Sequence, residues 1–550
     1  MAQFNMHPEW DWHYFETSHF RLFYTTDLSD WAHHIAPKME SIHEQVVVHI
    51  GYSCDEKIDV FLMDPMGSPN GMALPLKRHP LIILWVTAPG PESFWGGAED
   101  WSELVFCHED VHIVHLTLRS RNRWQRILNR FLPVGSMALK CPRYVSEGYA
   151  VILESRLTGN GRCQSTFRAT LLRQLALEGK LPDYEELNGS EQWLGGSYPY
   201  MVGSAFLEWL QARTDNPDCL LHLWKRMTAK KNRSYEAAFK GLFRESPSDL
   251  YDRFRAELTA RAISFEQQVN ETESVHSTPW AEFKGFASPG ALDSTGEQLA
   301  LVHEESGKPA HLLVLSMTQE KEPDSTAAQE DPEDIPDLPP LPAPRKELYR
   351  FTERNGIHPG PPRWTHDGKT LLFHAPVFDH TGTRRFDIFR WTPKTNDIER
   401  ITRIADLKYP DPLPDGIQAA VVYQHAGKSA PALLNLQTGK ITYLSPPAIT
   451  AIWGTPRVSP DGSRIAISGW GQNESWIEVF DVAKNTSQKI LAPTGTLYAY
   501  PAWHPDGRSI FLTSDETGVF NVIRIDTEGS AVQTVTHAVG GTLAPLPVLP

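Results

Sequence analysis

One turn sequence recurs through the second half of the chain and restricts that half to a single kind of architecture. The five copies read Asp293-Ser-Thr-Gly-Glu-Gln-Leu, Thr365-His-Asp-Gly-Lys-Thr-Leu, Pro414-Asp-Gly-Ile-Gln-Ala, Ser459-Pro-Asp-Gly-Ser-Arg-Ile and His504-Pro-Asp-Gly-Arg-Ser-Ile. The last three intervals between their glycines are 48, 46 and 45 residues (416−368, 462−416 and 507−462). Asp-Gly favours a tight turn between two strands, and this repeat length is typical of a four-stranded propeller blade. The pattern predicts an all-β propeller with five visible blades over residues 285–550.

The first interval is longer, 72 residues (368−296), because an acidic, proline-rich tract interrupts it at residues 318–344. This tract has too few apolar side chains to bury, so we predict a disordered surface loop. The chain ends at Leu546-Pro-Val-Leu-Pro550, roughly where a sixth blade would begin. Either five blades close with the tail as the closing strand, or the chain is a fragment of a longer protein; we favour the fragment.

The first half has a different texture and predicts an α+β unit over residues 1–265, followed by a linker at 266–284. Strand patterns occur at Phe20–Tyr24, Lys57–Met63 and Leu81–Val86, and Leu28–Val48 has apolar residues at helical spacing. From Asp100 to about Arg261 the pattern is helical throughout.

Charge and composition exclude several functional classes. The net charge of −15 argues against a nucleic-acid partner, which would require a basic face. No apolar run reaches the ~18 residues of a membrane span, and residues 1–11 lack the features of a signal peptide. The five cysteines form no C-x-x-C pair, which favours buried free thiols, with one disulfide left open if the protein is exported.

The strongest chemical signal is His108-Glu109-Asp110-Val111-His112, an H-E-x-x-H sequence. Asp100 followed by Glu103 marks a plausible helix start before it. On a helix, His108 and His112 project from one face and can bind one zinc ion, with Glu109 beside the metal to accept a proton from water.

A second segment supplies the third ligand that such a site needs. Glu147, in Tyr144-Val-Ser-Glu-Gly-Tyr-Ala150, follows His112 by 35 residues (147−112). A carboxylate there completes three protein ligands and leaves a position open. Glu154 lies two helical turns further along the same face, where it can hold a ligand histidine from behind.

Together these segments resemble the gluzincin metallopeptidases, of thermolysin-like fold, and the propeller repeat resembles the TolB-like family. The resemblance implies one Zn²⁺ held by His108, His112 and Glu147, with Glu109 as the general base. Tyr200-Met-Val-Gly203 is similar to the segment whose tyrosine stabilises the oxyanion in gluzincins, with Tyr198 as the rival. Asn70-Gly-Met-Ala73 is similar to the family's edge strand, which pairs with an extended peptide substrate. Because members of this family are usually exported, an extracytoplasmic location follows if a signal was removed.

Some residues depart from the family pattern. Asp110 adds a negative charge next to the site, where it either faces solvent or holds another residue. The Gly-x-Met-Glu-Asn sequence that binds a free amine in gluzincin aminopeptidases is absent, which favours an endopeptidase. His115 lies on about the ligand face, and we interpret it as a second-shell or core residue. The five arginines between Arg119 and Arg130 either bind an acidic partner or form a solvated face; we favour the solvated face.

Two functions follow from the sequence. The first is a zinc endopeptidase acting on a peptide or protein substrate, with the propeller restricting access or docking a protein partner. The alternative is a non-catalytic, propeller-based binding protein with a vestigial or structural zinc site. A serine peptidase is set aside because no G-x-S-x-G sequence occurs.

Overall fold

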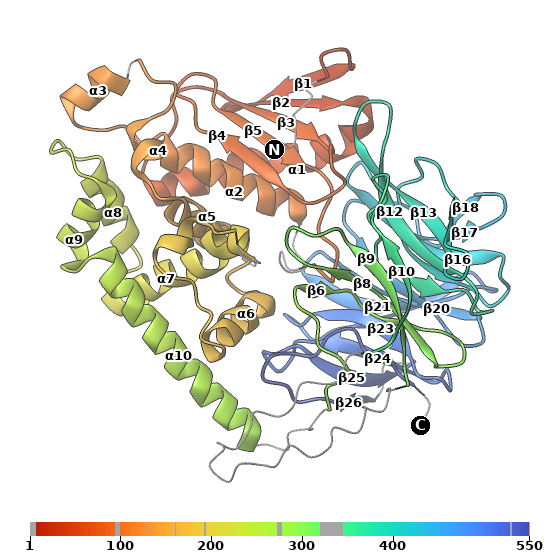
Figure 1. Ribbon diagram of the computed structural model, residues 1–550. Coiled ribbons are helices and arrows are strands. Elements are labelled where there is room, and N and C mark those ends of the chain that lie inside the picture. The colour runs from red at the N-terminus through yellow and green to blue at the C-terminus, as the bar shows by residue number, and fades with distance from the viewer. Residues whose placement is uncertain are drawn as a thin grey trace, which may run out of the picture.

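The computed structural model describes residues 7–93, 100–129, 131–159, 161–191, 194–271, 278–318, 345–527 and 531–548. Two units lie side by side, an N-terminal sheet with helices and a C-terminal propeller (Figure 1). Apart from Thr318, the loop predicted at 318–344 lies in a part of the chain outside these ranges, at residues 319–344.

A mixed five-stranded sheet begins the N-terminal unit. Its strands are β1 (Trp12–Glu16), β2 (Phe20–Thr25), β3 (Ile58–Met63), β4 (Gly71–Leu74) and β5 (Leu81–Trp85), in the order β1-β2-β3-β5-β4. The three inner strands are parallel, whereas β1 and β4 are antiparallel to their neighbours and form the two edges. The strands and the helix that the sequence predicts here are confirmed to within two residues.

Helices follow the sheet. They are α1 (Ser29–Ile50), α2 (Trp101–Leu116), α3 (Arg123–Asn129), α4 (Ser136–Lys140), α5 (Arg143–Thr158), α6 (Thr166–Leu177), α7 (Tyr198–Thr214), α8 (Cys219–Met227), α9 (Tyr235–Phe243) and α10 (Pro247–Glu271). Short 3₁₀ turns occupy Thr26–Leu28, Glu185–Asn188 and Gly195–Ser197. Helix α10 runs past residue 265, so the domain boundary predicted there lies inside a helix. The helix belongs to the N-terminal unit, on which it packs through Leu250, Tyr251 and Phe254.

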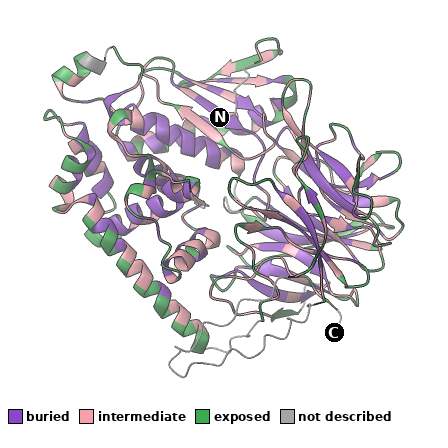
Figure 2. Cartoon of the chain, in the orientation of Figure 1, coloured by how far each residue is buried: buried purple, intermediate pink, exposed green. Residues whose placement is uncertain are grey.

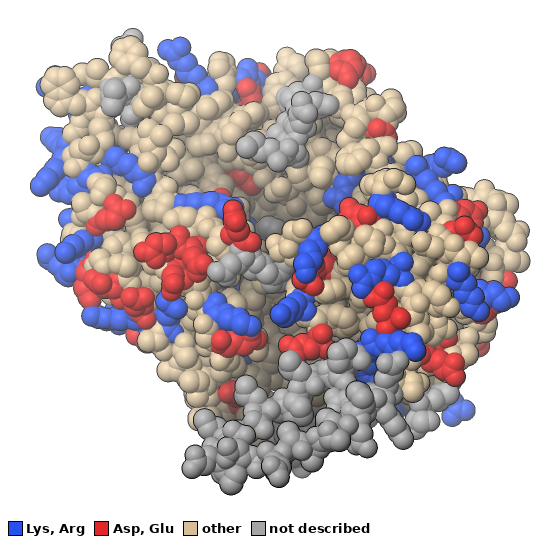
Figure 3. All heavy atoms as spheres, viewed as in Figure 1, with Lys and Arg blue, Asp and Glu red and all other residues tan. Residues whose placement is uncertain are grey.

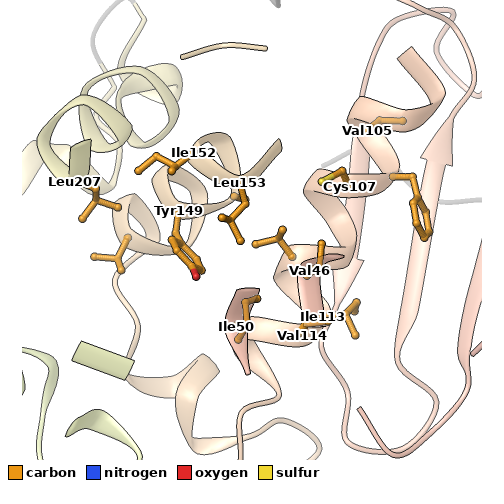
Figure 4. Packing of buried hydrophobic residues seen from close by; sticks show 14 of the residues in the cluster. Val46, Ile50, Val105, Cys107, Ile113, Val114, Tyr149, Ile152, Leu153 and Leu207 are labelled. Carbon is orange, nitrogen blue, oxygen red and sulfur yellow. The ribbon is translucent and has the colours of Figure 1, made fainter. Parts of the chain in front are cut away.

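The core of this unit is built around α2. Figure 4 shows Val46 and Ile50 of α1 facing Ile113 and Val114 of α2, with Leu153 of α5 beside them. Between Trp101 and Leu116, every residue except Glu103 is buried, and Figure 2 shows the buried residues concentrated on α2, α5 and the sheets. Polar side chains on a helix that is buried on all sides are costly where they lack partners. Among the described residues, Nδ1 of His112 and both ring nitrogens of His115 lack a hydrogen-bond partner.

Five antiparallel sheets form the propeller. In four of them the strands follow one another in chain order, whereas in the first sheet two short strands both pair with the strand that comes after them in the chain. Their strands are β6 (Phe286–Ala287), β7 (Ala291–Leu292), β8 (Gln298–Glu304), β9 (His311–Ser316) and β10 (Glu347–Thr352); β11 (Arg363–Trp364), β12 (Leu371–Phe378), β13 (Arg384–Thr392) and β14 (Asp397–Arg400); β15 (Leu407–Pro412), β16 (Gln418–His425), β17 (Lys428–Asn435) and β18 (Ile441–Tyr443); β19 (Ile452–Val458), β20 (Arg464–Gly471), β21 (Glu474–Asp481) and β22 (Thr486–Leu491); β23 (Tyr498–Trp503), β24 (Ser509–Ser514), β25 (Asn521–Asp526) and β26 (Val532–Thr534).

The repeated glycines occupy the turns for which the sequence selects them. Gly296 lies in the turn between β7 and β8, and Gly368, Gly416, Gly462 and Gly507 each lie between the first two strands of their blade. Their φ angles are 74°, 65°, 67°, 74° and 70° in this order. Only glycine adopts this backbone region without steric cost. The prediction of a five-bladed propeller is therefore confirmed.

The C-terminal tail passes from the last blade toward the first. Ala544 donates its backbone N–H to Thr513 in β24 at 3.1 Å, and Leu546 lies next to Gly290 of the first blade. No strand forms between residues 535 and 548, so within the described residues the tail does not supply the closing strand considered above.

The loop after β5 joins the two units. The Glu92 carboxylate accepts hydrogen bonds from the Thr455 backbone N–H and the Ser468 hydroxyl, both at 2.8 Å. The Tyr500 hydroxyl donates to the Glu92 carbonyl at 3.4 Å. The same loop lines a cavity of about 310 Å³ that propeller strands enclose. We refer to this set of contacts as the Glu92 clasp.

Two further features concern the whole chain. All five cysteines are free, as predicted, but only Cys107 and Cys219 are buried, whereas Cys54, Cys141 and Cys163 are half-buried. Among the described helices, none combines the length and the apolar character required to cross a bilayer.

Candidate functional site

Helix α2 positions the H-E-x-x-H residues between the sheet and α5. Asp100 caps the helix by accepting a hydrogen bond from the Ser102 N–H at 3.0 Å, which confirms the predicted helix start. His108 and His112 are one turn apart, and their rings meet edge to face with centroids 4.8 Å apart. Both are almost fully buried, so their polar atoms depend on neighbouring side chains for partners.

Three donor atoms from α2 and α5 converge on one point. His112 Nε2 lies 3.1 Å from His108 Nε2 and 3.0 Å from Glu147 Oε2, and His108 Nε2 lies 3.4 Å from the same oxygen. Tetrahedral coordination with bonds of ~2.0–2.1 Å would separate the ligand atoms by about 3.3 Å. The spacing and the donor types therefore fit a divalent transition metal, and these residues form a candidate metal centre.

Behind this triangle, a buried ion pair orients His108. The His108 Nδ1 lies 2.6 Å from Glu154 Oε2, as the sequence predicts for a residue two turns beyond Glu147. Arg162 donates to both oxygens of Glu154, at 2.6 and 2.7 Å. A carboxylate at Nδ1 fixes the tautomer in which Nε2 faces the centre with its lone pair.

Electrostatics at the centre favour a bound cation. Burial and Arg162 lower the pKa of His108, but Glu154 and Glu147 outweigh them and raise it to about 9. Burial would raise the pKa of Glu147, yet His112 and His108 hold it well below its usual range. Burial would also raise the pKa of Glu154, but Arg162 and His108 outweigh burial and lower this pKa to about 2. Two ionised carboxylates around two imidazoles stabilise positive charge at the point where the donors meet.

Glu109 lies on the other side of the cleft, against the edge strand β4. Its carboxylate is so close to Gly71 that a Cβ there would lie 2.5 Å from Oε1. Burial raises the pKa of Glu109, and His108 and His112 oppose this effect only in part. A buried carboxylate with a raised pKa beside a metal centre is suited to accept and return a proton.

A cleft of about 270 Å³ connects these groups. Its lining includes Gly71 and Met72 of β4, the α2 residues His108, Glu109 and His112, Glu147 of α5, Arg162 and Tyr200. The sequence predicts that five residues of this lining act together, and all five line the cleft: His108, Glu109, His112, Glu147 and Tyr200.

The two candidate tyrosines differ in position. Tyr200 stacks near His108 with ring centroids 6.1 Å apart, and the guanidinium of Arg162 lies 5.2 Å from its ring centroid. Burial raises its pKa to about 12, so its hydroxyl keeps its proton. Tyr198 is buried in the hydrophobic core and is not among the residues that line the cleft. Tyr200 is therefore the tyrosine that accompanies the site.

The remaining polar residues of α2 have structural roles. Asp110 is buried and accepts a hydrogen bond from His43 Nδ1 at 2.9 Å, so it holds another residue and does not face solvent. His115 packs against Trp224 and Tyr149, with centroid distances of 4.4 and 5.0 Å. Burial and His112 lower its pKa to about 3, which makes His115 a neutral core residue.

Three contacts of the site could not be predicted from the sequence. They are the contact of Arg162 with Glu154, the contact of Gly71 with Glu109, and the contact of His43 with Asp110. No local pattern marks Arg162, because it follows a glycine turn and reaches Glu154 only after the chain has folded back on α5. Gly71 was included in the expected edge strand, but its contact with Glu109 depends on how closely β4 approaches α2. His43 and Asp110 are 67 residues apart in the chain.

Comparisons with known proteins do not assign this chain. No family model matches it, and no curated protein matches it either. Among solved structures, TolB from Acinetobacter baumannii is similar at 15% identity and a TM-score of 0.34 over 45% of this chain and 54% of that one. Putative TolB from Agrobacterium tumefaciens is similar at 16% identity and a TM-score of 0.35, over 45% and 80%.

A structural study of two prolyl endopeptidases gives a third similar structure, at 13% identity and a TM-score of 0.31, over 52% of this chain and 42% of that one. The match thus spans about half the length of the Acinetobacter protein. At these identities and TM-scores, the likenesses assign no activity or ligand to this chain.

Proposed function

We propose that the chain is a zinc-dependent endopeptidase whose N-terminal unit is a gluzincin-type domain. The observation that carries this proposal is the convergence of His108 Nε2, His112 Nε2 and Glu147 Oε2 within 3.0–3.4 Å, with Glu109 in the same cleft. His108, His112 and Glu147 would hold one zinc ion. Bound there, zinc would supply Lewis-acid polarisation of the scissile carbonyl and acidify water.

Glu109 is the group that moves protons in this proposal. Its carboxylate accepts a proton from the attacking water and then delivers it to the nitrogen of the leaving amine. Burial raises the pKa of Glu109 and so favours the protonated form that the second transfer requires. Glu109 Oε1 also lies within reach of the backbone of β4, where a substrate would lie.

Tyr200 is the hydrogen-bond donor for the carbonyl oxygen of the scissile peptide bond in this proposal. Its pKa of about 12 keeps the phenol protonated, so the hydroxyl can donate a hydrogen bond as negative charge develops on that oxygen. The guanidinium groups of Arg162 and Arg143 lie 5.2 and 5.7 Å from its ring centroid and restrict the ring's position.

Strand β4 is the candidate substrate-binding element. It is an edge of the five-stranded sheet, and its residues Gly71, Met72 and Ala73 line the cleft. An edge strand offers free backbone groups, so an extended peptide can add to it as one more strand. This mode of binding does not require a free terminus, which agrees with an endopeptidase.

The test combines metal content with cleavage of a denatured protein such as casein. We expect wild type to bind about one zinc per chain and to cleave. Glu147→Ala should lose the metal, whereas Glu109→Gln should keep it and lose ~10²–10⁴-fold in rate. Glu44→Gln, an exposed residue on α1, is the matched control and should behave as wild type. Wild type that binds no metal, or Glu109→Gln that cleaves normally, would overturn the proposal.

A further inference from the structure

A short helix at one corner of the molecule exposes apolar side chains that the rest of the fold does not cover. In and after α3, the exposed fractions are 80% for Trp124, 56% for Ile127, 81% for Phe131 and 36% for Leu132. Trp124 and Ile127 are three residues apart on the helix and share one face. We call these four residues the α3 patch. Figure 1 shows α3 projecting from the body of the N-terminal unit.

The orientation of α3 is the reverse of an ordinary surface helix, because its polar side is the one held by the protein. Gln125 Nε2 donates to Asn232 Oδ1 at 2.6 Å, and Asn122 Nδ2 donates to the Lys230 carbonyl at 2.6 Å. The Arg121 backbone N–H donates to the Thr228 carbonyl at 2.7 Å. These bonds fix the segment with its apolar residues exposed to solvent, which indicates that an external partner covers them.

The surroundings of the patch are strongly basic in an acidic protein. Residues 111–146 and 219–235 contain no Asp or Glu, although the chain as a whole has a net charge of −15. The hydrogen bonds just described join these two segments. Their basic residues are Arg119, Arg121, Arg123, Arg126, Arg130, Lys140, Arg143, Lys225, Arg226, Lys230, Lys231 and Arg233.

The cations closest to the patch are available to an external anion. Arg121, Arg123 and Arg126 are exposed, and within the described parts of the chain neither Arg123 nor Arg126 forms an ion pair. In Figure 3, the corner that α3 occupies in Figure 1 shows tan and blue atoms. Exposed Trp and Phe next to unpaired Arg are the residue types that bind at the interface of an anionic bilayer.

We propose that the α3 patch and its arginines form a peripheral docking site for an anionic lipid surface. Trp124, Ile127 and Phe131 enter the boundary between headgroups and acyl chains, and Arg123 and Arg126 contact the phosphate groups. The apolar and the electrostatic contributions are both needed for stable attachment.

Docking of this kind would also place the cleft near the lipid surface. The segment after α3 is bonded to the segment after β4 through the Leu76–Val134 bridge and the hydrogen bond from the Lys77 N–H to the Pro133 carbonyl at 3.0 Å. The proposal does not depend on catalysis, because no residue of the metal centre takes part in it.

The experiment is co-sedimentation of the full chain with vesicles of phosphatidylcholine alone and with vesicles that contain phosphatidylglycerol. Wild type should bind only the anionic vesicles, and less as the salt concentration rises. Trp124→Ala/Phe131→Ala and Arg123→Glu/Arg126→Glu should each weaken binding by roughly tenfold or more. Glu109→Gln should bind as wild type, which separates this result from the proposed activity.

Matched controls are Phe378→Ala, whose side chain is 65% exposed on the propeller, and Lys369→Glu/Lys440→Glu, two exposed lysines distant in sequence. Both should bind as wild type. Circular dichroism of every variant establishes that it is folded. The proposal is overturned if wild type ignores anionic vesicles, or if the α3 variants bind as well as the controls. Binding of an acidic protein by the patch, without vesicle binding, would likewise overturn it.

Discussion

Glycine at position 71 creates the space that the Glu109 carboxylate occupies. A Cβ on residue 71 would lie 2.5 Å from Oε1 and 2.9 Å from the Cδ and Cγ atoms of Glu109. All three atoms belong to a flexible side chain, so the steric conflict would be relieved by moving Glu109 and not by disturbing the backbone of β4.

Gly71→Ala should therefore reduce cleavage strongly and leave the fold and the metal in place. We expect a loss of ~10²-fold or more in kcat/KM, since a misplacement of about 1 Å has that effect. Metal content and thermal unfolding should match wild type. Gly196→Ala is the control, because a Cβ there meets nothing within 4 Å. Loss of the metal in Gly71→Ala would show that this account of the contact is wrong.

In the proposed metal centre, Glu154 would act without touching the metal. It is fully buried, and its carboxylate bridges His108 Nδ1 and the guanidinium of Arg162. Glu154→Gln preserves the shape of the side chain but removes the charge that orients the imidazole and pairs with Arg162.

We expect Glu154→Gln to weaken metal binding by ~10–100-fold, as substitutions behind a ligand histidine do. Competition with a chelator measures this affinity directly. Glu154→Gln should also destabilise the fold, because it leaves the buried Arg162 cation unpaired. The double variant Glu154→Gln/Arg162→Met should recover part of this stability, because the cation is then removed as well. If chelator competition gives wild-type affinity for Glu154→Gln, the His108–Glu154 contact is unimportant for the metal.

At the scale of elements, the position of Glu147 depends on how closely α5 and α7 cross. A Cβ on Gly148 would lie 2.8 Å from the backbone C of Gly203, and a Cβ on Gly203 would lie 2.8 Å from the Tyr144 carbonyl oxygen. The glycines next to Glu147 and after Tyr200 thus meet at one crossing. In this way two short sequence patterns far apart in the chain bring their functional residues into one cleft.

Gly148→Ala should destabilise the protein and weaken metal binding. Alanine gains about 1 kcal/mol in helix propensity, but overpacking against backbone costs about 1–3 kcal/mol, and backbone cannot move aside as a side chain can. Gly241→Ala in α9 is the control, because the atoms nearest to its Cβ belong to the end of the Arg226 side chain, which can move aside, and not to backbone. Denaturant unfolding of the two variants decides the point: equal stability would exclude a tight crossing.

In the molecule as a whole, the Glu92 clasp ties the loop after β5 to the propeller. Glu92 lies in the loop after β5 of the N-terminal unit, and its carboxylate contacts Thr455 and Ser468 of the propeller. Burial raises the pKa of Glu92, and the hydrogen bonds from these two residues offset the rise only in part.

The clasp should make stability depend on pH. Because the folded protein binds this proton more tightly than the unfolded chain, the contribution is fully present below the unfolded pKa of ~4.3 and is lost as the pH rises through the folded value. The Tm of wild type minus the Tm of Glu92→Gln should therefore fall as the pH rises above ~4.3. Glu44→Gln should show no such trend, and a difference that grows with pH would contradict the assignment.

The propeller, the turn glycines and the candidate site residues can be predicted from the chain's residues, because each depends on short-range chemistry. Asp-Gly turns recur at the length of a blade, and histidines four residues apart on a helix must share a face. Residues such as Glu147 and Tyr200 could be proposed because their own neighbours form recognisable patterns.

Which of these residues meet, and what surrounds them, depends on how the folded segments pack together. The partnership of Arg162 with Glu154, the space that Gly71 leaves for Glu109, and the placement of Asp110 against His43 depend on packing between segments distant in the chain. Packing also decides that Tyr200 and not Tyr198 lines the cleft. The Glu92 clasp and the exposed face of α3 depend on packing in the same way. Local sequence fixes the conformation of a segment, but the neighbours of a side chain depend on which distant segments of the chain pack beside it.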